Sequence, residues 1–174
     1  MKKKILNVGC GNDNYGTHFI DFYPAKQKVV KCDVNKERFP FPDNYFDEVY
    51  SKYLFEHLKN FSHFLKEARR VLKKGGVLVI ITDNAGFWGI FGKVHHGGYE
   101  KRSFERRHKE DKHYALFTPN HLVNWLTFAG FKNIRVIYYV DEEVTFLRKH
   151  LFWIKTISFF IKRFSPQIKA VCEK

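Results

Sequence analysis

Short apolar runs, separated by polar turns, predict most of the strands of this chain. The strongest run is residues 77–81, Val-Leu-Val-Ile-Ile, which no polar residue interrupts. A strand without polar alternation is buried on both faces, as in the middle of a parallel sheet. Weaker runs predict the remaining strands at 4–8, 18–21, 28–32, 46–51, 134–140 and 167–172.

Three segments have the apolar spacing that is typical of helices. Residues 58–72 form the first, and Gly75-Gly76 is expected to close it because glycine adopts the left-handed turn at a helix end. Residues 118–129 form the second, with Thr118 as the expected N-cap and Gly130 after its end. Residues 144–164 form the third. Strands that alternate with helices predict an α/β domain with a mainly parallel sheet.

The composition indicates one globular domain over residues 1–174, since 44% of the residues are hydrophobic and 18% are aromatic. No stretch approaches the roughly 20 uninterrupted apolar residues that span a bilayer. The basic N-terminus lacks the apolar segment of a signal peptide, because Gly9-Cys10-Gly11 interrupts it. Three distant cysteines form neither a disulfide framework nor a zinc pattern, which suits a reducing compartment. We therefore expect a cytoplasmic protein.

The charge is strongly positive, with 31 basic and 18 acidic residues and a net charge of +13. Such a field favours anionic partners, namely nucleic acid, a membrane face or phosphorylated small molecules. A solvated lysine-rich surface explains the same charge equally well. The charge alone does not decide the function.

The first predicted strand ends in a glycine-rich turn, Gly9-Cys10-Gly11. Without a Cβ at either glycine, the backbone turns sharply and a ligand can approach the main chain closely. In open α/β sheets a ligand binds just outside the carboxyl ends of the strands. A dinucleotide fingerprint is not present, because position 14 is Asn14 rather than glycine and Asp21 follows Gly11 too soon.

The neighbouring motifs settle the interpretation. They are Leu6-Asn7-Val8-Gly9-Cys10-Gly11, Asp21, Asp33, the 39–49 segment Phe-Pro-Phe-Pro-Asp-Asn-Tyr-Phe-Asp-Glu-Val, Phe55-Glu56-His57-Leu58, and the 70–78 segment Arg-Val-Leu-Lys-Lys-Gly-Gly-Val-Leu. Their order and spacing resemble the class I S-adenosylmethionine (SAM)-dependent methyltransferases, the small "methyltransferase domain 11"-like group in particular. The resemblance is specific over about residues 5–82 and extends more loosely to about 131.

This resemblance implies a Rossmann-like, seven-stranded sheet of order 3-2-1-4-5-7-6, with the seventh strand antiparallel. It also implies SAM as the cofactor, with Asp21 on the ribose hydroxyls and Asp33 at the adenine amino group. The cofactor-binding residues that it implies are Asn7, Gly9, Cys10, Gly11, Asp21, Phe22, Asp33, Val34 and Ser51.

Three features depart from the family pattern. Asn7 stands where the family usually has an acidic residue, and Asp13 replaces the usual third glycine of the loop. Only residues 12–17 separate Gly11 from the second strand, whereas a parallel crossover normally takes a dozen or more residues. The first helices are therefore expected to be shortened or nearly absent. The alternative is that the second strand is misplaced, which would also displace Asp21.

Residues 84–117 have no regular period and contain four histidines, His95, His96, His108 and His113. Long irregular loops are often functional, and we expect this one to be a lid over the methyl-transfer site. His113 is the first candidate for a general base, with His57 as a second catalytic candidate. No cysteine or carboxylate pattern supports zinc, so no metal site is predicted. Cys10 is expected to be a small packing residue and Asp47 a structural one.

The predicted 144–164 helix has a basic arc that includes two aromatic residues, Phe152 and Phe159. Packing on the sheet explains its apolar side. Aromatic residues among cations also suit an anionic membrane face or a partner, so this helix is the candidate contact with the inner membrane face.

The leading hypothesis is a SAM-dependent methyltransferase that acts on an oxygen or nitrogen atom of a small molecule or a saccharide. The loose resemblance of residues 108–119 to methyltransferases of glycan synthesis favours a sugar. A tRNA or rRNA methyltransferase is the alternative that the charge suggests. However, Ser51-Lys52-Tyr53-Leu54 stands where base-amino methyltransferases have an Asn/Asp-Pro-Pro-aromatic motif. A non-catalytic SAM-binding scaffold is the third hypothesis, which the changes at Asn7 and Asp13 support.

Overall fold

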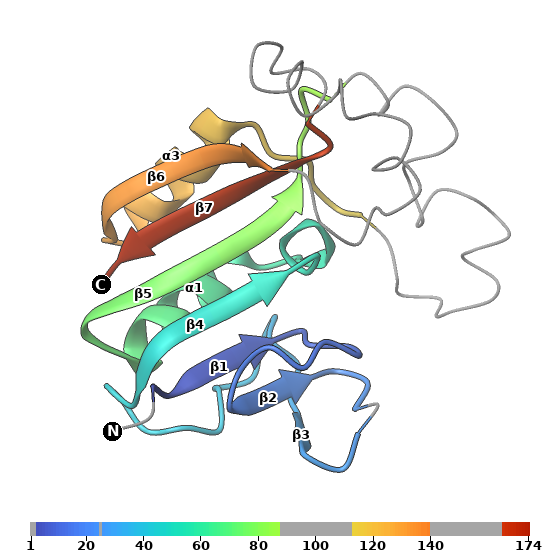
Figure 1. The fold of residues 1–174 in the computed structure, drawn as a ribbon, viewed down its shortest axis with the longest axis vertical. Coiled ribbons are helices and arrows are strands. Elements are labelled where there is room, and N and C mark those ends of the chain that lie inside the picture. Colours follow the sequence, from blue (N-terminus) through green and yellow to red (C-terminus); the bar gives the residue numbers. More distant parts are fainter. Residues whose placement is uncertain (1–2, 25, 88–112, 140–164) are drawn as a thin grey trace, which may run out of the picture.

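The computed structural model describes residues 3–24, 26–87, 113–139 and 165–174. These residues form one seven-stranded sheet of order β3-β2-β1-β4-β5-β7-β6 (Figure 1). The strands are β1 (Ile5–Val8), β2 (His18–Asp21), β3 (Val29–Lys31), β4 (Phe46–Lys52), β5 (Leu72–Asp83), β6 (Lys132–Tyr139) and β7 (Gln167–Glu173). β1 to β5 run parallel to one another, and β7 is antiparallel to both β5 and β6. The predicted Rossmann-like fold and strand order are confirmed.

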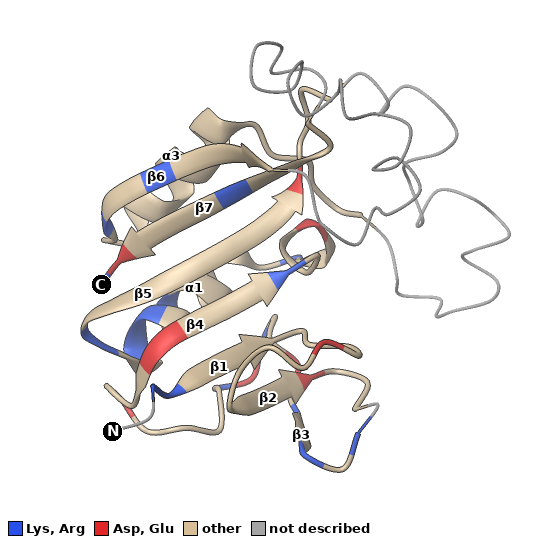
Figure 2. Cartoon of the chain, in the orientation of Figure 1, with Lys and Arg blue, Asp and Glu red and all other residues tan. Residues whose placement is uncertain are grey.

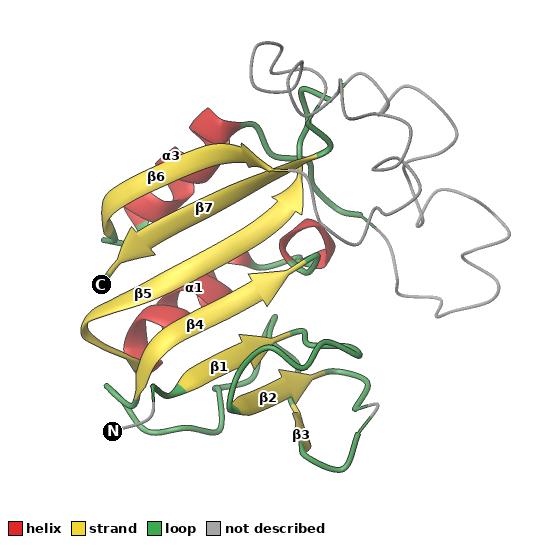
Figure 3. Ribbon diagram, viewed as in Figure 1, coloured by secondary structure: helices red, strands yellow, loops and turns green. Residues whose placement is uncertain are grey.

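Two α-helices lie on the same face of this sheet, α1 (Phe61–Val71) behind β4 and β5 and α3 (Pro119–Phe128) behind β6 and β7 (Figure 3). The core between the layers combines fully buried helix residues such as Leu65 and Leu122 with the strand residues Leu78 and Ile80. Burial of this apolar surface is the main source of the free energy of folding.

The boundaries of α3 agree with the sequence, but the end of α1 does not. Thr118 caps α3 by accepting a hydrogen bond from the backbone N–H of His121, and Gly130 has a φ of +83° after its end. α1 ends earlier, at Val71, and the next residue, Leu72, already pairs with Phe46 in the sheet. The prediction that Gly75-Gly76 closes this helix is therefore wrong. Gly75 has a φ of +74° in an irregular section of β5, where the β4–β5 register shifts.

The crossover from β1 to β2 is a loop, and the described residues between β1 and β4 contain no α-helix. This confirms the expected shortening of the first helices. Tyr15 in the loop packs on Tyr50 of β4 and donates a hydrogen bond to Glu48 Oε1 at 2.8 Å. Asn7 of β1 donates its amide N–H to the carbonyl oxygen of Tyr15 at 2.9 Å. These contacts fix the short loop against the sheet.

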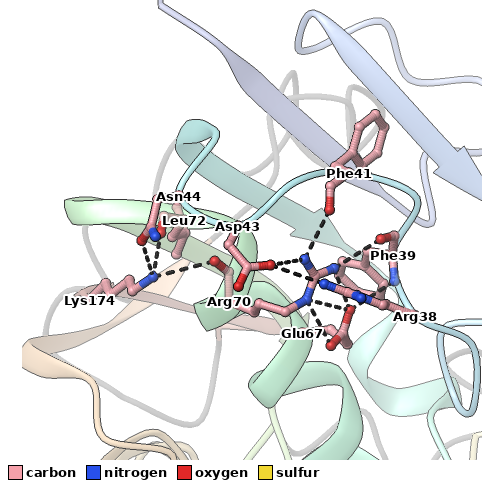
Figure 4. Close-up of polar contacts among 9 residues, drawn as sticks. All are labelled: Arg38, Phe39, Phe41, Asp43, Asn44, Glu67, Arg70, Leu72 and Lys174. Atoms are coloured by element: carbon pink, nitrogen blue, oxygen red, sulfur yellow. Dashed lines mark hydrogen bonds and ion pairs between the residues drawn. The ribbon is translucent and has the colours of Figure 1, made fainter.

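A network around Arg70 fastens the segment before β4 to α1 (Figure 4). The guanidinium donates to the carbonyl oxygens of Phe39 and Phe41, to Asp43 at 2.6 Å and to Glu67 at 2.7 Å. Asp47, at the start of β4, accepts from the backbone N–H of Lys4 and from the Lys73 ammonium. These contacts are consistent with the structural role expected for Asp47.

Two predicted features fall largely outside the described residues. The expected 144–164 helix lies outside them altogether, and of the expected 84–117 lid only residues 84–87 and 113–117 are described. Within the described part of the chain, no helix combines the length and the apolar character that crossing a membrane requires.

Candidate active site

The carboxyl ends of the parallel strands meet along one edge of the sheet, where acidic residues follow or end several of them (Figures 1 and 2). In an open α/β sheet, this edge is where ligands bind. The polar residues here fall into two neighbouring groups. One follows β1, β2 and β3, and the other follows β4 and β5.

The glycine turn after β1 contributes backbone rather than side chains. Gly9 and Gly11 have φ values of +68° and +48°, which favour glycine at both positions. At Gly9 a Cβ would come within 2.8 Å of the Leu54 side chain, so the loop after β4 packs directly on this turn. At Gly11 nothing lies within 4 Å of the Cβ position. The backbone at Gly11 is therefore open to a ligand.

Asp21, the last residue of β2, binds this turn through its side chain. Its Oδ2 accepts a hydrogen bond from the backbone N–H of Gly11, and its Oδ1 accepts one from Tyr23, both at 2.8 Å. A carboxylate has about four lone-pair sites, so two remain for the hydroxyls of a ligand. The predicted position of Asp21 at the end of the second strand is confirmed by the structure.

Asp33 lies two residues after β3 and close to Asp21 along the edge. The backbone N–H of Cys32 donates to the carbonyl oxygen of Asp21 at 3.0 Å, which places the two carboxylates on adjoining turns. The Asp33 side chain accepts from the N–H of Asn35 and forms an ion pair of 3.4 Å with Lys36.

The other residues predicted to bind the cofactor differ in their access to solvent. Phe22 is 42% exposed, whereas Asn7, Cys10 and Val34 are buried. Burial, together with the charge of Asp21, raises the pKa of the Cys10 thiol to about 11, so it is neutral at physiological pH and suited to packing. Ser51 is fully buried in β4, and its hydroxyl makes no hydrogen bond within the described part of the chain.

The second group contains His113, which the structure brings against the end of β5. Its Nδ1 lies 3.3 Å from Oδ2 of Asp83, the last residue of β5. The backbone N–H groups of Tyr114 and Ala115 both donate to the carbonyl oxygen of Glu56, at 2.8 and 3.3 Å. The segment that carries His113 is therefore fixed to the turn after β4.

His57 completes this group. It lies in the short 3-10 helix η1 (Phe55–His57), and its ring meets the ring of His113 edge-on, with centroids 4.6 Å apart. The aromatic contacts of Phe55 with Phe61 and Phe117 hold η1 and the 113–117 segment together from the core side. The two residues predicted to be catalytic, His57 and His113, thus come together in space.

Glu56 is buried, and its carboxylate lies within 4.8 Å of a ring nitrogen of His57 and of His113. Its Oε2 accepts a hydrogen bond from the Thr82 hydroxyl at 2.7 Å. Burial and the nearby charge of Asp83 raise the pKa of Glu56 to about 7. Buried carboxyl groups with shifted pKa values cluster at functional sites.

Sequence reasoning missed Thr82 and Asp83 as members of the site. Both are buried polar residues that end β5 directly after its apolar run. That position, a polar pair at the carboxyl end of a central parallel strand, is the feature that could have identified them.

Comparison with known proteins gives a consistent picture. Residues 6–80 match the family described as "Methyltransferase domain". An uncharacterized protein of Methanocaldococcus jannaschii is 29% identical over 155 residues, covering 82% of this chain and 71% of that protein. A tRNA U34 carboxymethyltransferase of Mannheimia succiniciproducens is also 29% identical, over 83% of this chain and 49% of that enzyme. The chain thus spans about half the length of the second relative.

The fold has solved counterparts as well. A SAM-dependent methyltransferase of Archaeoglobus fulgidus superposes on 99% of this chain and 86% of its own, with a TM-score of 0.64 and 19% identity. At 19% identity, this similarity supports the fold alone. The identity of the ligand is argued from the motifs at the strand ends.

Proposed function

We propose that this chain is a class I SAM-dependent methyltransferase that methylates an oxygen or nitrogen atom of a small molecule or a saccharide. The methyltransferase-domain match over residues 6–80 and the shared fold support this proposal. The methyl donor is SAM, which when bound supplies a methyl group already activated by its sulfonium. The protein must then align the acceptor behind that methyl group and take the acceptor's proton.

The first group of residues fits the cofactor. We assign the nucleoside part of SAM to the open backbone at Gly11 and to the carboxylates of Asp21 and Asp33, which stand at the ends of β2 and β3. The remaining lone pairs of Asp21 suit the ribose hydroxyls. Gly9 forms a tight turn that packs on the Leu54 side chain. This contact connects the proposed cofactor site to the residues after β4.

The proton-accepting part of the proposal rests on one observation, the 3.3 Å contact between His113 and Asp83 at the end of β5. A carboxylate next to Nδ1 orients an imidazole and stabilises its protonated form. The His113 side chain is 10% exposed, so the ring is largely shielded from bulk water. We assign His113 as the general base, Asp83 as its orienting carboxylate, and His57 as the ring that borders it.

RNA is the second candidate acceptor. The net charge of +13 and the similarity to a tRNA carboxymethyltransferase favour it. The sequence Ser51-Lys52-Tyr53-Leu54, which spans the end of β4, lacks the proline-containing base clamp. For this reason RNA is the second candidate.

A methyl-transfer screen with labelled SAM tests this proposal. The purified chain is incubated with nucleotide sugars, small phenols and amines, and bulk RNA as separate acceptor sets. We expect label in a small-molecule set, and a loss of about 10²–10⁴ in kcat for His113→Asn, the usual contribution of a general base. His121→Asn, a change of an exposed histidine in α3, serves as the matched control. Label found in RNA alone would favour the second candidate, and activity unaffected by His113→Asn would contradict the assigned base.

A further inference from the structure

Glu56, His57 and His113 form a cluster of potential metal ligands. Each residue offers one ligand atom, and these atoms all lie within 4.8 Å of one another. Glu56 is buried, His57 is partly buried, and the His113 side chain is 10% exposed. Two histidines and one carboxylate are a ligand set that proteins use for zinc and for non-haem iron.

The groups around this cluster have the arrangement that supports metal ligands in proteins. Metal-binding histidines usually have a carboxylate at the second ring nitrogen, and ligating carboxylates are themselves hydrogen-bonded. Here Asp83 lies 3.3 Å from Nδ1 of His113. The Thr82 hydroxyl donates to Oε2 of Glu56 at 2.7 Å. Both supporting residues come from the end of β5, a rigid central strand.

The backbone also holds the ligands in place before any ion binds. Glu56 and His57 are neighbours in η1, and the carbonyl oxygen of Glu56 accepts the N–H of Tyr114, the residue after His113. His113 therefore cannot move far from the other two side chains without breaking this hydrogen bond. Preorganised ligands reduce the ordering cost of binding.

We propose that Glu56, His57 and His113 bind one divalent transition-metal ion, with Zn²⁺ the best match. Imidazole nitrogen suits zinc, iron and nickel, whereas Mg²⁺ and Ca²⁺ prefer oxygen ligands. Three protein ligands leave a coordination position open, as in catalytic rather than structural zinc sites. An ion and a proton compete for the same imidazole of His113, so the metal-bound cluster is a second state of the site. Zinc binding is a property separate from methyl transfer, and it can be measured without SAM or an acceptor.

Calorimetric titration of the chelator-treated chain with ZnCl₂, in the absence of SAM, tests the site. We expect one ion per chain and no comparable heat with MgCl₂. His57→Asn and His113→Asn, each of which removes a ligand, are expected to weaken zinc binding by about 100-fold or more, and Asp83→Asn by about 10–100-fold. Visible absorption of the Co²⁺-substituted chain, followed in the same variants, reports independently on the nitrogen ligands.

His121→Asn is the matched control, since His121 is exposed at the start of α3 and outside the cluster. Circular dichroism and thermal unfolding confirm that each variant is folded. If Glu56→Gln fails to fold because its side chain is buried, the two histidine variants still decide the question. The proposal is overturned if the chain binds no zinc in stoichiometric amount, or if His57→Asn and His113→Asn bind as tightly as the wild type. A chain that binds SAM but not zinc overturns this inference alone, and one that binds zinc but not SAM contradicts only the proposed function.

Discussion

Asp21 connects the strand end to the glycine turn and to the proposed ribose site. Its two oxygens already accept the N–H groups of Gly11 and Tyr23. The side chain is therefore oriented before a ligand arrives. A residue that both shapes the turn and binds the ligand should be sensitive to any change that removes its charge.

We expect Asp21→Ala to weaken SAM binding by about 1–3 kcal/mol, because buried ribose hydroxyls would lose a charged acceptor. Calorimetry with SAM and with its demethylated product measures this directly. Asp13→Ala is the comparison, since Asp13 lies in the same loop and its side chain accepts a local hydrogen bond from the backbone N–H of Tyr15. The assignment fails if neither ligand gives heat with the wild-type chain at millimolar concentration, or if the two variants bind SAM equally well.

At the level of the elements, an ion pair within α1 supports the hydrogen bonds that join this helix to the segment before β4. Glu67 and Arg70 lie one turn apart on α1, with side chains that are 8% and 15% exposed. Burial raises the pKa of Glu67, but hydrogen bonds from Arg70 and from the backbone N–H of Phe39 outweigh burial and lower it overall. The ionised carboxylate is thus the form that stabilises the fold.

Glu67→Gln is expected to lower the free energy of unfolding by about 2 kcal/mol at pH 7, since charged hydrogen bonds are lost at a largely buried position. A carboxyl group whose pKa is lowered on folding contributes stability above its unfolded pKa and loses it as the pH falls. The difference from wild type should therefore be constant above about pH 5 and shrink below pH 4.5, the ordinary value for this group. Urea unfolding between pH 3 and 8 tests this, with the exposed Glu173→Gln as the control. A difference that persists unchanged at pH 3 would contradict it.

The elements that the sequence predicted well are those whose limits depend on local chemistry. Thr118, Pro119 and Gly130 define α3 through capping and backbone preference alone. The predicted end of α1 is wrong because Leu72 pairs with Phe46, a residue far away in the chain. This sheet contact overrides the local preference of Gly75-Gly76 for a helix end. Asp21 could be predicted because it ends a strand beside the glycine turn. The meeting of His57 with His113 could not, since it depends on the hydrogen bond from Tyr114 to Glu56.

For the whole molecule, the net charge is strongly positive, at +13. Four acidic residues nevertheless lie at or after the ends of β2, β3, β4 and β5, namely Asp21, Asp33, Glu56 and Asp83. Figure 2 shows acidic segments along this edge of the sheet. A positive far field attracts any polyanion, with or without a specific site for it. Binding of RNA at low salt is therefore expected whether or not RNA is the substrate, and binding alone does not identify the acceptor.

The salt dependence of RNA affinity distinguishes non-specific binding by net charge from binding of RNA as the substrate. Attraction that depends only on net charge releases counterions, and a protein with 6–10 phosphate contacts loses about 10³–10⁵ in affinity between 50 and 200 mM salt. We expect the affinity for bulk tRNA, measured by filter binding, to fall steeply over this range, while SAM affinity changes little because its site is local. Arg135→Glu, a charge reversal on the exposed side of β6, should reduce RNA binding at 50 mM salt without affecting SAM. RNA binding that persists at 200 mM, accompanied by methyl incorporation into the RNA, would contradict a small-molecule acceptor and make RNA the substrate.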